Sequence, residues 1–499
     1  HYGYVDGSSM SAEMVKNPVE LMSLGHRSNE YWRFNGKAFA GIELWEGLKF
    51  QTSLAYAFDL NATKSYTPKS PARYDADGNI VKAAGETNKE EDYWYRNATW
   101  TNENLLTYNK QFDKHNINVL LGHSVIGSRF YKTTASIQGF PTENIYELKG
   151  GTINPGATGE SEEYKLQSFF GRVNYSYDDR YLFEFNIRHD GSSRMPKANR
   201  YATFPSLSAG WVFSNEGFMK DYRNFSLGKL RLSWGKLGND RIDPFQYINP
   251  YVMENGAILG KTPSIGKAIY PGVLANPNVT WEKVDSKNVA VDGNFWNGML
   301  GFTVEYFFQN RKDILTARQA SIPSYTGLGN TLPDENLGEV NNQGIEIMLN
   351  HRNKIGEVNY YIGGNFTFAR NKIKFFDEAA NIPEWQRQTG GPLNTWLMYK
   401  TDGIYQNWDE VNSSVHMPGA QPGDIKYVDV DNNGVISEND KVRSETGNVP
   451  EIVYGINYGI EWKGLEVSMM WTGQGRASQM IVPYSYNQDK DLYYNRWIS

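Results

Sequence analysis

The sharpest chemical signature in the sequence is a run of oxygen-bearing residues between positions 429 and 440. Its candidate ligands are the side chains of Asp429, Asp431, Asn433 and Asp440 and the backbone carbonyl of Val435. In a calcium-binding loop of this type, oxygen ligands stand at positions 1, 3, 5, 7 and 12, and a glycine at position 6 permits the bend. Gly434 occupies that sixth position. The spacing therefore predicts a Ca²⁺ site.

Two interpretations of this loop stay open. Its last candidate ligand, Asp440, is shorter than the glutamate usual at that position, so bidentate reach is less assured. A polar turn of the Asx type would show similar residues and needs no ion. If the loop faces the cell exterior, where calcium is roughly millimolar, even a weak site would be filled.

Other side chains that could do chemistry do not converge on a reaction. The seven histidines are scattered without metal-ligand spacing, and Ser192 and Ser193 follow Asp-Gly and do not stand in a Gly-x-Ser-x-Gly nucleophile motif. The net charge is −6, whereas a nucleic-acid-binding protein usually shows a basic surface. We therefore expect neither an enzyme nor a nucleic-acid partner.

Four aromatic residues of one long connection form a second candidate site. They are Trp385, Trp396, Tyr405 and Trp408. Their rings could stack on sugar faces or on the side chains of a peptide. Ordinary packing within the loop, or anchoring at an interface, is the competing interpretation.

The elements that would position these residues are β-strands. Apolar residues alternate with polar ones in segments of roughly ten residues, as in the strands of a membrane barrel. In residues 169–190 one face carries Phe169, Val173 and Tyr175, and the other carries Arg172 and Asn174. The pattern predicts roughly fourteen strands.

The connections between these strands alternate between short and long. Short turns are expected at residues 178–180, 297–298 and 463–464. Long connections are expected at residues 61–91, 129–163, 238–279, 312–337 and 372–450. Helical periodicity is weak, and residues 11–24 and 377–388 are the only short helix candidates. Short turns at one end and long loops at the other are typical of outer-membrane barrels.

Composition agrees with a strand-rich membrane protein. Among 499 residues, 14% are aromatic and 48 are glycine, and cysteine is absent, which excludes disulfides and thiolate sites. Mean hydropathy is −0.60, and no run is long and apolar enough for a membrane-spanning helix. A soluble multi-stranded carbohydrate-binding or structural β-protein, with the apolar faces packed in a core, is the alternative.

Several phrases of the sequence resemble the SusC/RagA family of TonB-dependent outer-membrane transporters. In order along the chain they are GRVNYSYDDRY (171–181), RHDGSSR (188–194), FPS (204–206), AGW (209–211), LRLSWG (230–235), NPN (276–278), WEK (281–283), GEVNNQGIE (338–346), PGDIKY (422–427) and DVDNNG (429–434). Their number and order over about residues 95–475 carry the resemblance.

This resemblance implies a 22-stranded barrel in the bacterial outer membrane that is filled by an N-terminal plug. It also implies import of glycans or peptides, powered through TonB, together with a SusD-like surface lipoprotein. A dimer of such SusC–SusD pairs is a further expectation. No plug, no TonB segment and no terminal aromatic strand are recognised in the sequence. Residues 1–499 are therefore expected to form a partial barrel domain, without the plug and the last strands.

Overall fold

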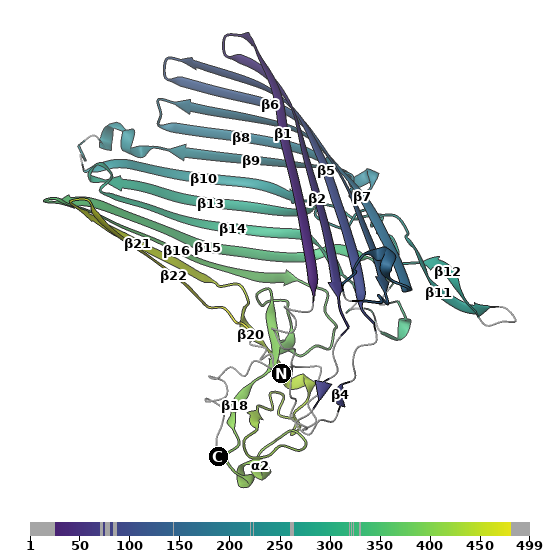
Figure 1. Ribbon diagram of the computed structural model, residues 1–499. Coiled ribbons are helices and arrows are strands. Elements are labelled where there is room, and N and C mark those ends of the chain that lie inside the picture. Colours follow the sequence, from purple (N-terminus) through teal and green to yellow (C-terminus); the bar gives the residue numbers. More distant parts are fainter. Residues whose placement is uncertain are drawn as a thin grey trace.

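One large antiparallel sheet dominates the computed structural model (Figure 1). The structure describes residues 25–480 except 70–72, 75–79, 83–86, 143, 220, 223, 260–263, 319, 321, 323 and 329–330. The strands of the sheet, in spatial order, are β1 (His26–Trp45), β2 (Leu48–Thr67), β5 (Lys89–Phe112), β6 (His115–Gln138), β7 (Ile153–Tyr177), β8 (Tyr181–Ser192), β9 (Tyr201–Trp211), β10 (Phe225–Asn239), β13 (Glu282–Phe295), β14 (Leu300–Ala317), β15 (Asp334–Ile355), β16 (Val358–Phe375), β21 (Ile452–Trp462) and β22 (Leu465–Gly475).

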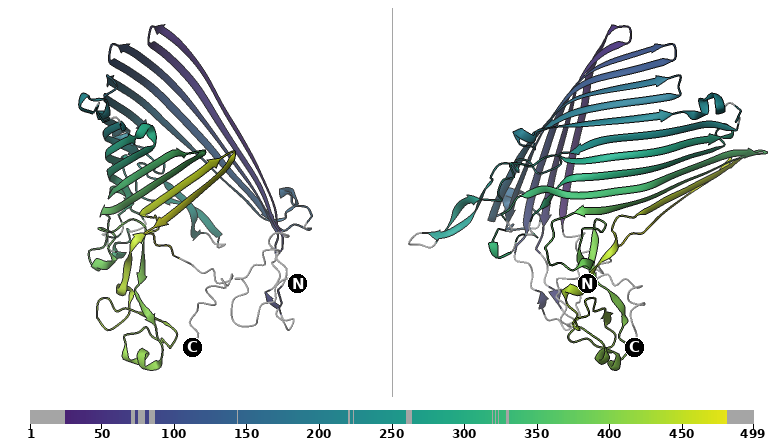
Figure 2. Two further views of the ribbon diagram at one scale, coloured as in Figure 1. Left: turned by 90° about the vertical axis from the view of Figure 1, so that its left-hand side faces the viewer. Right: turned by 180° about the vertical axis from the view of Figure 1, so that it is seen from behind.

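The sheet is a meander in which each strand pairs with the next large strand of the chain. It contains 14 strands, as the alternation predicted, and it curves into a trough with β1 and β22 at its edges (Figure 2). Hairpin turns occur where the sequence predicted them. Asp178 and Asp179 adopt positive φ, as do Asn297 and Gly298 and then Lys463 and Gly464, which suits tight turns that follow the strand twist.

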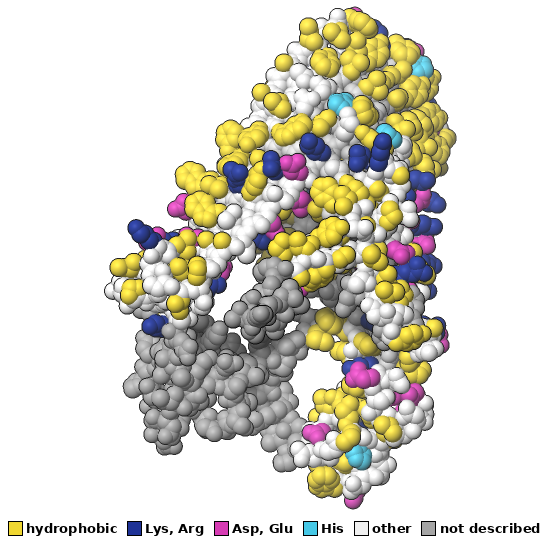
Figure 3. Space-filling view, turned by 90° about the vertical axis from the view of Figure 1, so that its right-hand side faces the viewer, with side chains coloured by type: hydrophobic (Ala, Val, Ile, Leu, Met, Phe, Trp, Pro, Cys, Tyr) yellow, Lys and Arg dark blue, Asp and Glu magenta, His cyan; other side chains and the backbone are white. Residues whose placement is uncertain are grey.

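The two faces of the sheet differ in chemistry. The convex face carries apolar side chains, and Phe183, Ile187 and Val289 keep 44%, 41% and 47% of their surface exposed. Figure 3 shows such side chains crowded over a face of the sheet. Among the described residues, the other sheets are two-stranded and none covers these rows. The alternative of a soluble protein with buried apolar rows is therefore wrong.

The strands run further than the sequence predicted. The strand β2 continues to Thr67, β6 continues to Gln138 and β7 begins at Ile153, so the long connections are shorter than expected. The extensions are rich in polar residues on both faces of the sheet, so alternation is lost there while backbone pairing continues. The long connections nevertheless all leave from one end of the sheet (Figure 1).

Short strands and 3₁₀ turns lie in the connections at both ends of the large sheet. They are β3 (Arg73–Tyr74), β4 (Ile80–Lys82), η1 (Leu148–Gly150), η2 (Lys197–Asn199), η3 (Phe213–Asn215), η4 (Gly217–Met219), β11 (Tyr251–Leu259), β12 (Ser264–Pro271), η5 (Trp296–Gly298) and η6 (Ser324–Thr326). At the long-loop end, Met195, Phe204 and Trp281 form a buried cluster. This cluster assigns a packing role to Phe204 and Trp281 of the family-like phrases FPS and WEK.

Neither of the two predicted helices is found among the described residues. Residues 11–24 lie outside the described part of the chain. The candidate at 377–388 is wrong, because only the 3₁₀ turn η7 (Glu384–Gln386) forms there, directly after Pro383. Proline fixes its own φ and lacks an amide proton, which opposes a helix through that point. No helix among the described residues is long and apolar enough to cross a membrane.

Candidate functional site: a loop module and a polar concave wall

The longest connection folds into a small unit of its own, residues 376–451, which we call the loop module. It contains η7, β17 (Thr395–Tyr399), β18 (Thr401–Ile404), α2 (Trp408–Ser413), β19 (Ile425–Tyr427), η8 (Glu438–Asp440) and β20 (Lys441–Gly447). At its base, the buried carboxylate of Glu451 forms ion pairs with Arg370 at 3.2 Å and Arg476 at 2.8 Å. This bridge ties the module to β16 and to the end of β22.

The predicted calcium loop lies in the module, between β19 and β20. The carboxylates of Asp429, Asp431 and Asp440 each place an oxygen within 4.8 Å of the others. Asp440 is fully buried, whereas the other two are half-buried. Convergence of carboxylate oxygens at a bend is the arrangement that a hard cation such as Ca²⁺ prefers.

Backbone amides shape the bend. The amide of Gly434 donates to Asp429 at 2.8 Å, and the amide of Val435 donates to the Asn433 side chain at 2.8 Å. Gly434 adopts a φ of 84°, which glycine tolerates without strain. The Val435 side chain is exposed, and ligation by its backbone carbonyl at position 7 stays a prediction.

The electrostatics of Asp440 favour its charged form. Burial by itself raises the pKa of this carboxyl, but hydrogen bonds donated by the amides of Ser437, Val430 and Asp431 outweigh it and hold the pKa below the ordinary value. Asp440 also forms a reciprocal capping box with Ser437 at η8. Asp440 is therefore held in its charged form at neutral pH.

The four predicted aromatic residues do not form one cluster. The indole of Trp385 donates to Asn439 and that of Trp396 donates to Ser478, at 2.7 and 3.0 Å. Trp408 begins α2 and is 57% exposed. Tyr405 is 1% exposed and donates to the Val415 carbonyl, so it belongs to the core of the module. A buried ring cannot stack on a substrate, and the candidate role of Tyr405 is corrected accordingly.

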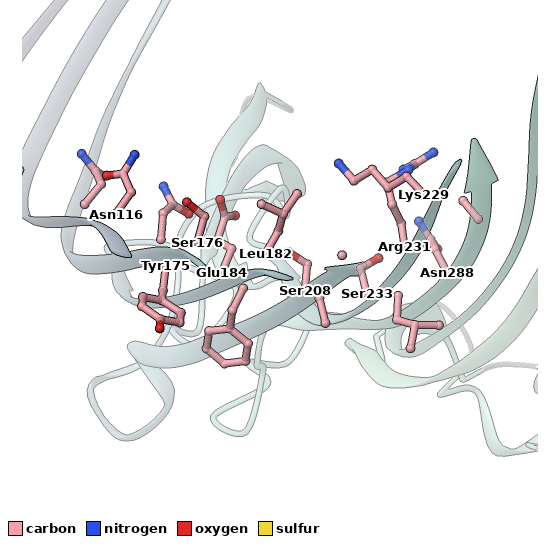
Figure 4. Close-up of a pocket in the computed structure, with 17 residues that line it drawn as sticks. Asn116, Tyr175, Ser176, Leu182, Glu184, Ser208, Lys229, Arg231, Ser233 and Asn288 are labelled. Carbon is pink, nitrogen blue, oxygen red and sulfur yellow. The ribbon is translucent and has the colours of Figure 1, made fainter. Parts of the chain in front are cut away.

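The concave face of the sheet carries a second candidate surface, a shallow pocket of about 390 Å³. Its polar lining includes Asn116, Ser176, Glu184, Ser208, Lys229 and Arg231. Figure 4 shows these side chains rising from one face of the sheet while Tyr175 points away from the opposite face. The sequence predicted a polar face on these strands, but the pocket depends on register and curvature, which the pattern does not report.

Charged groups on this wall are paired across strands. Arg231 of β10 contacts Asp292 of β13 at 2.7 Å and Glu305 of β14 at 3.5 Å. Glu305 also accepts from Asn288 at 3.1 Å. The network keeps the concave face hydrophilic and ordered, which suits a wall that polar solutes pass.

Comparison with known proteins assigns the architecture. Residues 19–490 match the family model described as "TonB dependent receptor-like, beta-barrel". The chain is 29% identical over 492 residues to TonB-dependent receptor P3 of Formosa agariphila, covering 94% of this chain and 47% of that protein. It is 31% identical over 310 residues to TonB-dependent receptor SusC of Bacteroides thetaiotaomicron, covering 61% of this chain and 30% of that protein.

Solved structures agree with this fold. The RagAB peptide importer in its "open-open" state superposes with a TM-score of 0.76 at 22% identity, over 92% of this chain and 48% of that chain. This chain thus spans about half the length of receptor P3 and of the RagAB chain, and less of SusC. The family-like phrases, the 14-stranded sheet with its two unlike faces and the family match agree. The chain belongs to the TonB-dependent receptors, in the SusC/RagA family that its motifs predicted, and its sheet is barrel wall of the bacterial outer membrane.

Proposed function

We propose that the protein imports glycans or peptides across the outer membrane, as the barrel of a complex with a SusD-like surface lipoprotein and with energy supplied through TonB. In this role the chain performs passage and not catalysis. The names of its relatives support the two substrate classes, since one is SusC and another is described as a peptide importer.

The observation that carries the proposal is the contrast between the faces of the same strands. On β10, Leu232 is 47% exposed and pairs with Val289 of the exposed apolar row, while the side chain of its neighbour Ser233 rises from the opposite, concave face (Figure 4). An apolar exterior suits lipid, and a polar interior suits a wet path for hydrophilic solutes.

Uptake by cells tests the proposal. A strain lacking the gene, complemented with the full-length transporter, is supplied with labelled oligosaccharides and, separately, labelled peptides. We expect deletion to abolish uptake of one class, and loss of TonB to abolish it equally. Affinity purification of the tagged transporter is expected to recover a surface lipoprotein. Uptake of both classes unchanged by deletion would contradict the proposal.

We propose that the loop module contributes to substrate or lid contacts through its accessible indoles. Trp408 is the most exposed of the three remaining candidates, and Trp385 and Trp396 are held by hydrogen bonds. Trp408→Ala is expected to lower uptake severalfold. Trp94→Ala, which removes an equally exposed indole from the convex face, is the matched control and should leave uptake unchanged.

We also propose that the loop of residues 429–440 binds Ca²⁺ and that the ion stabilises the loop module. Three converging carboxylates in a bend repel one another, and a divalent cation relieves that repulsion. The exposed position of the loop suits a weak site, of the kind that extracellular calcium fills.

Calorimetry decides whether the loop of residues 429–440 binds Ca²⁺. The full-length transporter is titrated with CaCl₂ after chelation, alongside Asp431→Asn and the control Asp409→Asn, which changes an exposed acid of α2 outside the cluster. We expect one Ca²⁺ per chain at this loop, lost in Asp431→Asn and retained in Asp409→Asn. Identical titrations for all three proteins would refute a site here.

A further inference from the structure

Beyond the apolar rows, the convex face carries a series of exposed cations on the long-loop side. They are Arg96, Arg129, Lys165, Lys283, Lys312 and Arg370, which we call the basic belt. The belt has one member on each of six strands, β5, β6, β7, β13, β14 and β16. Figure 3 shows Lys and Arg side chains along the border of the apolar area.

Strand register places the belt on the lipid side. Residues paired across neighbouring antiparallel strands share a face. The pairings run from Arg370 through Gln343 and Phe308 to Lys287. They continue through Trp234, Leu207, Phe185 and Val173 to Val119. Arg370 therefore points to the same face as the apolar row that crosses the sheet.

The members of the belt lie at a similar depth in the membrane, and they are not all paired with one another across the strands. Strands of such barrels tilt by about 35–45°, so a constant depth shifts by roughly one residue per strand. The line from Arg370 meets β6 at Val119, and the cation of β6, Arg129, lies further along toward the long-loop end. On the intervening β13, Lys283 is displaced in the same direction from the registered Lys287. The direction of this drift is the one that a level ring on tilted strands requires, while Lys283 and Lys312 on adjacent strands are paired directly.

Part of the belt's charge is not neutralised. Four of the six cations have a carboxylate partner: Arg129 contacts Glu163 at 3.1 Å, Lys283 contacts Asp313 at 2.9 Å, Lys312 contacts Glu339 at 3.4 Å and Arg370 contacts Glu451 at 3.2 Å. No carboxylate of the described residues forms an ion pair with Arg96 or Lys165. The guanidinium groups of Arg96 and Arg129 both lie over the ring of Tyr131, at 4.3 and 4.5 Å. Two like charges on one ring, beside Lys165 on the next strand, form a preorganised anion-binding group.

The short-turn end of the same face has no such group in the described residues. Its convex border carries aromatic residues such as Tyr181 and Trp211. Cations there are neutralised within turns, as in the contacts of Lys114 with Asp178 at 3.3 Å and Lys463 with Glu357 at 2.9 Å. Among the described residues, the belt cations without an ion-pair partner, Arg96 and Lys165, thus lie at the long-loop border.

We propose that the basic belt binds the phosphate groups of lipid head groups in the membrane leaflet on the long-loop side, with Arg96, Arg129 and Lys165 as its strongest site. Guanidinium and ammonium groups are the donors that suit phosphate oxygens. The belt borders the apolar rows, so one amphiphile can contact both with its chains and its head group. The inference uses the outer-membrane location and does not depend on import.

Lipid binding to the purified full-length transporter in detergent tests the inference. The probes are lipid A and phosphatase-treated lipid A, which differ only in phosphate, and binding is measured by native mass spectrometry. The belt variant combines Arg96→Gln, Arg129→Gln and Lys165→Gln. The matched control combines Lys110→Gln, Lys114→Gln and Lys463→Gln at the short-turn end. Each cation near a charged lipid surface strengthens binding about fivefold.

We expect lipid A binding to weaken at least tenfold in the belt variant and to stay within about twofold in the control. Native protein should bind phosphatase-treated lipid A as weakly as the belt variant binds lipid A. Equal binding of both lipids by native protein, or an equal loss in the control, would overturn the inference. If the triple variant fails to fold, Lys165→Gln alone is expected to weaken binding severalfold, and an unchanged affinity would count against the site.

Discussion

The sheet and the loop module differ in where their apolar side chains point. In the sheet the apolar residues point outward, and Leu232 and Val289 remain about half exposed in the isolated chain. In the module some apolar residues point inward and form a core, in which Tyr405 and Val411 are each 1% exposed. The difference shows that one chain is built for two solvents, with lipid completing the sheet and water surrounding the module.

Removing a core residue of the module should have the largest effect. Tyr405→Ala deletes a buried ring and its bond to Val415, and it is expected to cost the module about 3–5 kcal/mol. Limited proteolysis should then cut residues 376–451 while the sheet survives. Tyr405→Phe, which keeps the ring, should cost only about 1 kcal/mol. Loss of the sheet together with the module would show that the two regions are not independent.

A charge on the convex face should have the next largest effect. Leu232→Arg is expected to destabilise the barrel in lipid by about 2–4 kcal/mol, because it moves a charge into hydrocarbon. Ser233→Arg places the same side chain on the neighbouring residue of the wet face and should cost far less. Urea unfolding in lipid vesicles measures both. Equal costs would remove the distinction between the faces.

Acidic pH should destabilise the loop module by a smaller amount than these substitutions. Because the folded pKa of Asp440 is lowered, its contribution is fully present above the unfolded pKa of about 4 and is lost as the pH falls through the folded value. Apparent unfolding temperature of the module should therefore drop by a few degrees at acidic pH. Asp440→Asn should lower it at neutral pH and flatten this pH dependence. An unfolding temperature of the native module that does not change with pH would contradict the stabilising role given to the Asp440 carboxylate.

The sheet was largely predictable because a strand's side-chain period survives in the sequence. Alternation along residues such as 169–177 and turn dipeptides such as Asn297-Gly298 report local geometry directly. Strand ends were less predictable. Beyond the membrane both faces of β6 and β7 meet water. Polar pairs such as Lys132 and Glu160 occur there, and the sequence shows no alternation of apolar and polar residues.

The module was predictable only where its chemistry is local. The calcium-like loop is set by spacing within a few residues, and its carboxylates converge as predicted. Burial of Tyr405 depends on contacts with residues 415 and 424, which no periodicity announces. The basic belt could not be predicted from the sequence for a related reason. Its members are far apart along the chain, and only strand register and tilt bring them to one level.

The claim on which the account depends is that the convex face touches hydrocarbon. The 499-residue sequence has no cysteine, so Leu232→Cys and Ser233→Cys can each carry one fluorophore, with a cysteine-free background in this part of the protein. In reconstituted vesicles, a bromine-labelled acyl chain should quench the label at 232 and iodide should quench the label at 233. The reverse pattern, or iodide quenching of both labels, would contradict the account.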